Sequence, residues 1–291
     1  MRIVLAVLLT VAVFTGMAYA QRTYRAEIEK WRTAHEAELT ADDGWLTVAG
    51  LFWLKEGSNS VGSAAGSDIE LTDNFKGGKF GRIDLRDGKV FLTVDDGVDA
   101  TVGGKTVKTA EMASDEKGKP SLVKVGSQTF YLIKRGDKLG IRLKDTASKA
   151  RRSFTHLKWY PIDPKFRVTA KFERYAEPKE VLISNVLGGT VKMRSPGLLR
   201  FTLNGAAMTL EPVDEDGKLF INFRDTTSRT TTYAAGRFLY ADAPAGDTVI
   251  LDFNKAENPP CAFTSFATCP LPPQRNRLSI EIRAGEKRYG H

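Results

Sequence analysis

The stretch RIDLRDGKVFLTV, residues 82–94, places two runs of alternating apolar and polar residues on either side of Asp87-Gly88. Both residues of an Asp-Gly pair tolerate the positive φ of a tight two-residue turn, so the pattern predicts a β-hairpin. A second pair of such runs follows within residues 128–144. Short runs spaced about 8–12 residues apart predict one β-sandwich or barrel-like domain over residues 41–150.

The second half of the chain continues this pattern, with Asn204-Gly205 among its turns. We expect strands at residues 199–203, 206–213, 218–225, 231–240, 248–254 and 278–283. A connection over residues 151–165 contains two prolines and several aromatic residues, and we expect it to be rigid. The predicted fold class is therefore mainly β, with two packed β-sandwich or barrel-like domains, the second over residues 166–291.

One amphipathic helix is predicted at residues 21–40. Tyr24, Ile28, Trp31 and His35 recur at three- and four-residue steps and form an apolar stripe, while charged residues occupy the other faces. We expect Trp31 to anchor this stripe on a sheet. A histidine within such a stripe is more often packed in a core than used as a ligand, so we expect His35 to be structural.

The N-terminus has the pattern of a cleavable signal peptide over residues 1–20. Arg2 supplies a positive charge, residues 3–14 are almost wholly apolar, and Ala18 and Ala20 form a small-x-small cleavage site. The apolar run is shorter than the roughly 20 residues that a membrane span needs. We therefore expect cleavage after Ala20, a secreted or periplasmic protein, and no stable membrane anchor. An uncleaved anchor helix is the alternative.

The formal net charge of +8 comes from 43 Lys and Arg against 35 Asp and Glu, which are interspersed along the chain. No basic block marks a nucleic-acid surface, and an exported protein has no routine access to nucleic acid, so we predict no nucleic-acid partner. Weak attraction to anionic envelope polymers is more consistent with this charge. The sequence leaves protein partners and the oligomeric state open.

Two cysteines, Cys261 and Cys269, are present. In an oxidising compartment an even number at short spacing predicts a disulfide, worth about 2–3 kcal/mol on the chain-entropy model. No histidine lies near them in the sequence, so we predict no zinc site. No phosphate-binding or dinucleotide-binding glycine motif and no EF-hand loop occurs elsewhere, and we predict no cofactor and no metal.

A proline-rich segment near the C-terminus carries a family resemblance. It reads NPPCA at residues 258–262 and CPLPP at residues 269–273. Together with FRDTT at 223–227 and DFN at 252–254, it resembles a bacterial and archaeal family catalogued as domain of unknown function number sixteen-eighty-four. Glu257 departs from the family pattern, in which we expect a tyrosine. The resemblance implies no activity.

The order of the predicted strands within residues 41–150 loosely resembles a forkhead-associated β-sandwich. Such domains bind phosphothreonine through an Arg, a Ser-x-x-His and an Asn-Gly. None of these is at the expected place, and Gly103-Gly104 occupies the turn that would carry Asn-Gly. The resemblance therefore implies a topology but no phosphopeptide binding.

Strand periodicity places two opposite charges inside the second domain. Asp225 is phased with Ile221 and Phe223, and Arg237 is phased with Leu239. Inward charges are costly unless they are paired or face a polar cavity. We therefore expect a polar pocket beside the proline-rich loop. Its predicted ligand-binding residues are Asp225, Tyr233, Arg237, Asp252, Asn254 and Asn258.

A buried pair that fixes strand register is the alternative interpretation of Asp225 and Arg237. Three functions remain open. We favour binding of a small polar or anionic ligand. The second is a hydrolase-like enzyme with Asp225 or Asp252 as general base and Arg237 as anion clamp. The third is a structural or interaction protein without a pocket. A Ser-His-Asp hydrolase is disfavoured, because His156 is the one serious candidate imidazole.

Overall fold

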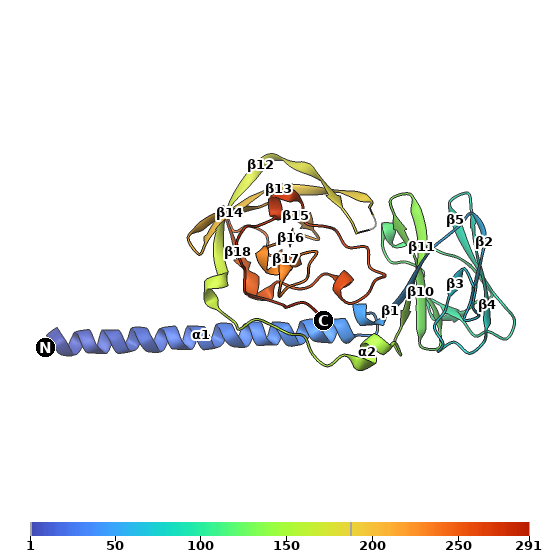
Figure 1. The fold of residues 1–291 in the computed structure, drawn as a ribbon, viewed down its shortest axis with the longest axis horizontal. Coiled ribbons are helices and arrows are strands. Elements are labelled where there is room, and N and C mark those ends of the chain that lie inside the picture. The colour runs from blue at the N-terminus through green and yellow to red at the C-terminus, as the bar shows by residue number, and fades with distance from the viewer. Residues whose placement is uncertain (1, 187, 291) are drawn as a thin grey trace. The chain divides into compact units, whose positions relative to one another are not determined.

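The computed structural model describes residues 21–186 and 188–290, of which Lys117 is described by its backbone alone. For residues 2–20 it also describes the backbone alone. The predicted signal peptide, residues 1–20, thus lies outside the fully described part of the chain. Helix α1 (Arg2–Thr40) is the long N-terminal helix (Figure 1). Within the described residues, no helix is both long enough and apolar enough to cross a membrane.

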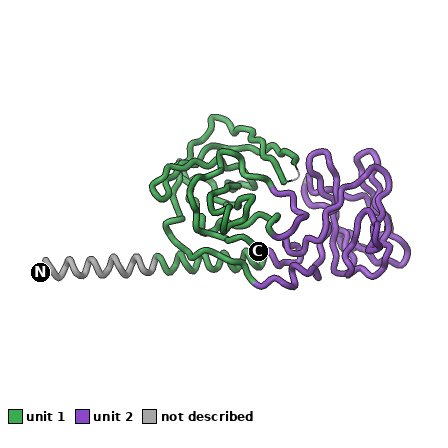
Figure 2. Tube along the Cα trace, viewed as in Figure 1, with its two compact units in different colours: residues 1–37, 156–262, 270–291 green, residues 38–155, 263–269 purple. Residues whose placement is uncertain are grey.

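The chain divides into two compact units (Figure 2). Unit 1 comprises residues 1–37, 156–262 and 270–291, and unit 2 comprises residues 38–155 and 263–269. Both units are built mainly of β-strands, so the predicted fold class is confirmed.

Unit 2 contains a five-stranded sheet of order β3-β2-β4-β5-β8 and a six-stranded sheet of order β1-β11-β10-β9-β6-β7. Its strands are β1 (Val48–Trp53), β2 (Gly57–Gly62), β3 (Ile69–Glu70), β4 (Lys79–Arg86), β5 (Lys89–Val94), β6 (Thr101–Val102), β7 (Lys105–Thr106), β8 (Thr109–Glu111), β9 (Val123–Val125), β10 (Gln128–Arg135) and β11 (Lys138–Asp145). Its short helices are η1 (Trp45–Thr47), η2 (Asp115–Lys117) and α2 (Lys149–Ser153).

The predicted hairpin at Asp87-Gly88 joins β4 to β5. Asp87 and Gly88 have φ of 51° and 73°, the left-handed conformation that the turn requires. Inward side chains of both sheets, such as Ile83 of β4 and Phe130 of β10, form one buried core. The alternation read from the sequence therefore decides which face of each strand is covered.

A buried carboxylate, Asp145, holds the ends of this unit together. It accepts hydrogen bonds from the side chains of Thr72 (2.5 Å), Asn74 (2.6 Å) and Ser127 (2.7 Å), and from the backbone N–H of Ala147 (2.8 Å). Burial raises the pKa of Asp145, but these donors outweigh it and lower the pKa below its usual value. One side chain thereby fixes three separate loops to the end of β11.

Unit 1 contains a four-stranded sheet of order β14-β13-β12-β18 and a three-stranded sheet of order β15-β16-β17. Its strands are β12 (Arg167–Ser184), β13 (Thr190–Leu203), β14 (Ala206–Leu210), β15 (Val213–Glu215), β16 (Lys218–Phe223), β17 (Arg237–Ala241) and β18 (Thr248–Asp252). Its short helices are η3 (Pro164–Phe166), η4 (Thr226–Arg229), η5 (Phe253–Lys255), η6 (Pro260–Ala262) and η7 (Gln274–Asn276).

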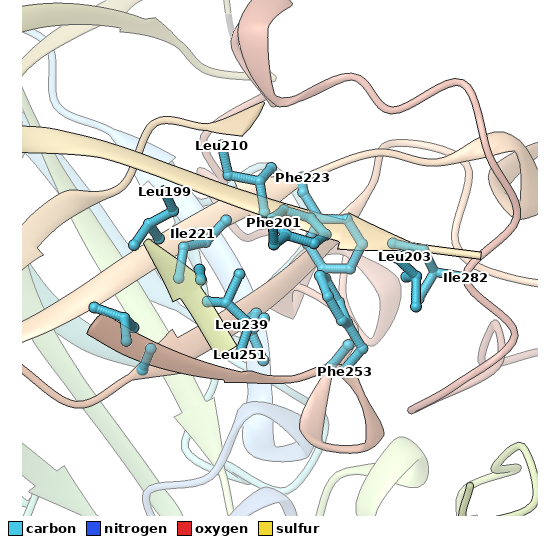
Figure 3. Packing of buried hydrophobic residues seen from close by; sticks show 14 of the residues in the cluster. Leu199, Phe201, Leu203, Leu210, Ile221, Phe223, Leu239, Leu251, Phe253 and Ile282 are labelled. Atoms are coloured by element: carbon cyan, nitrogen blue, oxygen red, sulfur yellow. The ribbon is translucent and has the colours of Figure 1, made fainter. Parts of the chain in front are cut away.

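The core of unit 1 lies between its two sheets, where Phe201, Phe223 and Phe253 gather (Figure 3). The ring of Phe253 meets that of Phe223 edge-on, with 5.5 Å between ring centres. Phe253 belongs to η5, directly after β18, so an irregular segment completes the core. This arrangement fixes the chain just before the proline-rich loop.

Three predicted strands of unit 1 differ from the structure, two in their bounds and one altogether. Residues 231–236 stay outside β17, because Asp225 caps η4 and the following residues form turns. Residues 278–283 form no strand, and the backbone of Ile282 is instead bound by side chains at its N–H and at its carbonyl. The expected strand at 248–254 ends at Asp252, which caps η5.

Helix α1 packs through the predicted stripe. Ile28 is fully buried, and Trp31 stacks on His35 with ring centroids 5.3 Å apart. Both rings meet the ring of Trp159 edge-on. The expected packing of His35 is confirmed, and Trp31 contacts the connection at Trp159.

Asp145→Asn tests the role of the buried carboxylate in unit 2. We expect a loss of about 1.5–3 kcal/mol of stability at pH 7, because the charged acceptor is removed from several donors. A lowered folded-state pKa contributes stability above the unfolded pKa, near 4, and loses it as the pH falls through the folded value. Urea unfolding at several pH values should thus show the difference from wild type shrinking below about pH 4. A difference that is independent of pH contradicts this role.

Candidate functional site

The predicted charges of the second domain meet as a buried ion pair. Arg237 Nη2 lies 3.1 Å from Asp225 Oδ1, and the two residues are 0% and 3% exposed. Burial lowers the pKa of Arg237, and the adjacent carboxylate opposes that shift. The predicted inward orientation of both side chains is therefore what the structure shows.

The carboxylate of Asp225 has its acceptor positions occupied. It accepts from the N–H and hydroxyl of Thr227 at the start of η4, from Arg237, and from the N–H of Ile282 at 2.7 Å. Arg237 in turn donates to the carbonyl oxygens of Ile282 (2.9 Å) and Ala284. The pair is thus an internal anchor for residues 282–284 and does not face solvent.

Asp252 and Asn254 form a second hydrogen-bonded group, with Tyr24 of α1. The Tyr24 hydroxyl donates to both oxygens of Asp252, at 2.9 and 3.0 Å. Burial, followed by the charge of Asp252, raises the pKa of Tyr24. Asn254 accepts from the N–H of Asp163 at 3.0 Å and donates to its carbonyl at 2.9 Å. These two residues therefore fasten α1 and the connection to the end of β18.

Asn258 belongs to a third group, which sequence reasoning did not foresee. Its backbone N–H donates to Glu286 at 2.8 Å and its side-chain amide donates to the carbonyl of Lys287 at 2.8 Å. Glu286 is fully buried and lies 3.6 Å from His35 Nε2, while Glu257 lies 3.3 Å from His35 Nδ1. An imidazole is thus placed between two carboxylates.

Tyr233 contacts the proline-rich loop through a hydrogen bond. Its hydroxyl donates to the carbonyl of Cys261 at 3.0 Å, and burial raises its pKa. Cys261 and Cys269 are disulfide-bonded, as predicted from their spacing. The six predicted residues therefore lie in separate hydrogen-bonded groups, and among their buried side-chain atoms Arg237 Nε and Asn258 Oδ1 have no hydrogen bond.

Unit 1 contains a groove of about 810 Å³. It lies beside two of these hydrogen-bonded groups, that of Asn254 and that of the Asp225–Arg237 pair. One wall is the connection, residues 160–166, and the other is residues 280–283. Asn254 fixes the first wall at Asp163, and the Asp225–Arg237 pair fixes the second wall at Ile282. The predicted site residues thus position the groove without lining it.

Tyr160 is fixed at every polar atom within the first wall. Its N–H donates to the carbonyl of Gly285 at 2.9 Å, its carbonyl accepts from Arg32 at 3.0 Å, and its hydroxyl bonds to Thr231. Gly285 has φ of 75°, and a Cβ at this position would lie 2.4 Å from the carbonyl oxygen of Ala256. Glycine is therefore required at the residue whose carbonyl accepts from Tyr160.

The groove combines apolar and charged side chains. Tyr160, Pro161, Phe166 and Ile280 supply apolar and aromatic surface. Two ion pairs also line it: Lys165 with Asp163 at 3.0 Å, and Arg283 with Glu281 at 2.7 Å. The side chains of Lys165 and Arg283 are 58% and 66% exposed, so both cations are accessible.

Sequence reasoning missed the residues that line the groove. The aromatic connection was recognised as rigid, which was the available signal for Tyr160 and Phe166. Ile280 and Arg283 were expected in a strand, and their strand phase gave no hint of a shared site. The two walls approach each other only through the folded arrangement.

The fold and the site define a mainly β protein with a groove whose walls are held in place by buried polar groups. The family described as "Protein of unknown function (DUF1684)" matches residues 152–287, and the chain belongs to this family. The match covers the connection, the groove and the proline-rich loop.

The chain is also similar to an uncharacterised protein of Haloarcula marismortui whose structure was determined in solution by NMR. The two share 33% sequence identity over 47% of this chain and 78% of the other, with a TM-score of 0.40. No curated protein shows significant similarity to the chain.

A double-mutant cycle tests whether the Asp225–Arg237 pair acts as one unit. Asp225→Ala and Arg237→Met should each cost about 3–5 kcal/mol of stability, because each leaves a buried partner uncompensated. The double variant should cost clearly less than the sum, as measured by urea unfolding.

Glu173→Ala is the control, because it breaks the exposed pair of Glu173 with Arg200 on β12 and β13. Its cost should stay below about 1 kcal/mol. Additive single effects, or single effects as small as the control's, would show that the buried pair is not the anchor.

Proposed function

We propose that this protein is an exported binding protein, and that its ligand is a small molecule with an anionic group that occupies the groove of unit 1. The proposal rests on two accessible cations, Lys165 and Arg283, that lie beside apolar side chains in one groove. Hydrogen bonds within the chain hold both walls of this groove in place. The signal-peptide pattern supports export.

Preorganisation favours binding at this groove. A ligand that must order mobile loops loses part of its interaction energy to that ordering. Here Asn254 bonds Asp163 in one wall, and Arg237 and Asp225 bond Ile282 in the other. The main chain on both sides therefore has its binding geometry before a ligand arrives.

The charges that line the groove are balanced, with Lys165 and Arg283 against Asp163 and Glu281, so an anion is favoured by the net charge of the whole chain. The exposed pairs Lys165–Asp163 and Arg283–Glu281 are each worth little in water, typically about 0–1 kcal/mol, so a ligand group can replace either carboxylate. The chain carries a formal net charge of +8, which raises the local concentration of anions. Phe166 and Ile280 offer surface for an apolar part of the same ligand.

The hydrolase-like alternative has less support. A general base needs a free lone pair within reach of a substrate proton. Asp225 already accepts from Thr227, Arg237 and Ile282, and Asp252 accepts from Tyr24 and Asn254. Ligand binding without turnover is therefore the function that these contacts favour.

Thermal-shift screening of small carboxylates and phosphate esters tests the groove. A ligand that raises the Tm of the mature wild-type protein should lose most of its effect, about tenfold in Kd, in Arg283→Ala or Lys165→Ala. Lys192→Ala is the matched control, since Lys192 also forms an exposed ion pair, with Glu180 on the β12–β13 hairpin. A ligand whose shift is equal in wild type and both groove variants binds elsewhere and overturns the proposal.

Export has its own test. Expressed with its natural N-terminus in a Gram-negative host, the protein should be found in the periplasm as a chain that begins at Gln21, because Ala18 and Ala20 suit signal peptidase. Intact mass measurement and N-terminal sequencing show this directly. Ala20→Leu should block cleavage, and a wild-type chain that retains residues 1–20 contradicts the prediction.

A further inference from the structure

A second buried arginine, in unit 2, differs from Arg237 in having no carboxylate partner among the described residues. Arg142 lies in β11 and is 4% exposed. Its Nε and Nη2 atoms are buried and make no hydrogen bond, and no carboxylate among the described residues forms an ion pair with it. A guanidinium in this state is expensive, because its hydration is lost and nothing replaces it.

The surroundings of Arg142 are positively charged and aromatic. Its guanidinium carbon lies 5.3 Å from the ring centre of Trp45. Lys144, two residues along the same strand and hence on the same face, donates to the main-chain carbonyl of Asp43 and lies 5.8 Å from the ring centre of Tyr131. Burial lowers the pKa of Lys144, the charge of Asp43 opposes that shift, and the charge of Arg142 adds to it.

The two unpartnered atoms have a defined geometry. Nε–H and one N–H of Nη2 lie on the same edge of the guanidinium and point in parallel. This edge matches the two oxygens of a carboxylate or phosphate group, which accept both hydrogen bonds at once. The Trp45 ring holds the guanidinium plane through a cation–π contact and leaves this edge unused.

We propose that Arg142 is the binding residue for an oxyanion, the carboxylate or phosphate group of a small ligand, with Lys144 adding to the attraction. The ligand oxygens accept from Nε and Nη2 and supply a counter-charge at the guanidinium, with which no carboxylate of the described residues forms an ion pair. This site is independent of the groove in unit 1, since Arg142, Lys144, Trp45 and Tyr131 all belong to unit 2.

The comparison of Arg142 with Arg237 supports this assignment. Both guanidinium groups are buried, but Arg237 donates to a carboxylate and two carbonyls. Only its Nε is left without a hydrogen bond, whereas Arg142 lacks one at both Nε and Nη2. Arg142 has aromatic contact alone, as expected for a side chain whose partner comes from outside the chain.

Thermal unfolding in acetate, in inorganic phosphate and in chloride at equal ionic strength tests the proposal. Acetate or phosphate should raise the Tm of the wild-type protein by about 2 °C or more above chloride. Arg142→Lys keeps the charge but loses the parallel N–H edge, and it should abolish this shift. Arg82→Lys is the control, since Arg82 pairs with Asp84 on β4 and should leave the shift intact.

The relative size of the acetate and phosphate shifts identifies the group that is bound. No shift in either anion, or a shift that persists in Arg142→Lys, overturns the proposal.

Arg142→Met gives a second measurement that does not depend on the choice of anion. In chloride this variant should have a Tm equal to or above that of wild type, because an unpaired buried cation is removed. A Tm lower by several degrees would show that Arg142 stabilises the fold by contacts within the chain, and would contradict a site that awaits an anion.

Discussion

Burial of the Arg237 guanidinium is the constraint on which unit 1 depends. A charge removed from water must have its donors satisfied by groups that move with it. Asp225 provides the counter-charge, and the carbonyls of Ile282 and Ala284 accept two further hydrogen bonds, which leaves only Nε without one. A side chain of β17 thereby holds a C-terminal segment that has no strand of its own, and the second wall of the groove is held with it.

Segments without regular secondary structure form both walls of the groove. Side chains, and not the backbone of a neighbouring strand, form hydrogen bonds with the backbone of these segments at Asp163 and Ile282. Asn254 bonds both the N–H and the carbonyl of Asp163 in the connection. Asp225 and Arg237 bond the same two groups of Ile282. Such an arrangement leaves the surface of both walls available for ligand contacts, while the rigid sheets behind them set the spacing. The buried polar residues are therefore positioning groups, and the exposed Lys165 and Arg283 are the groups that a ligand would meet.

Two arginines with similar burial have opposite environments in this protein. Arg237 is surrounded by acceptors, whereas Arg142 has the Trp45 ring and a neighbouring cation, Lys144. Burial by itself therefore does not distinguish the structural Arg237 from Arg142, for which we propose a ligand. The distinction lies in whether the chain supplies the partner, which is a property of the whole fold.

The sequence by itself determined the turns, and with them the strand ends beside the turns, because Asp87-Gly88 and Asn204-Gly205 require only local conformation. The strand before Asn204 begins at Thr190, earlier than the predicted residue 199. It also placed Asp225 and Arg237 on the inner face through strand periodicity. Tertiary structure alone decided that Asp225 bonds Ile282, 57 residues away, and that Tyr24 bonds Asp252, 228 residues away. Residues 278–283 have strand-like composition, but the side chains of Asp225 and Arg237 bind the backbone N–H and carbonyl of Ile282. No local sequence pattern encodes such distant partners.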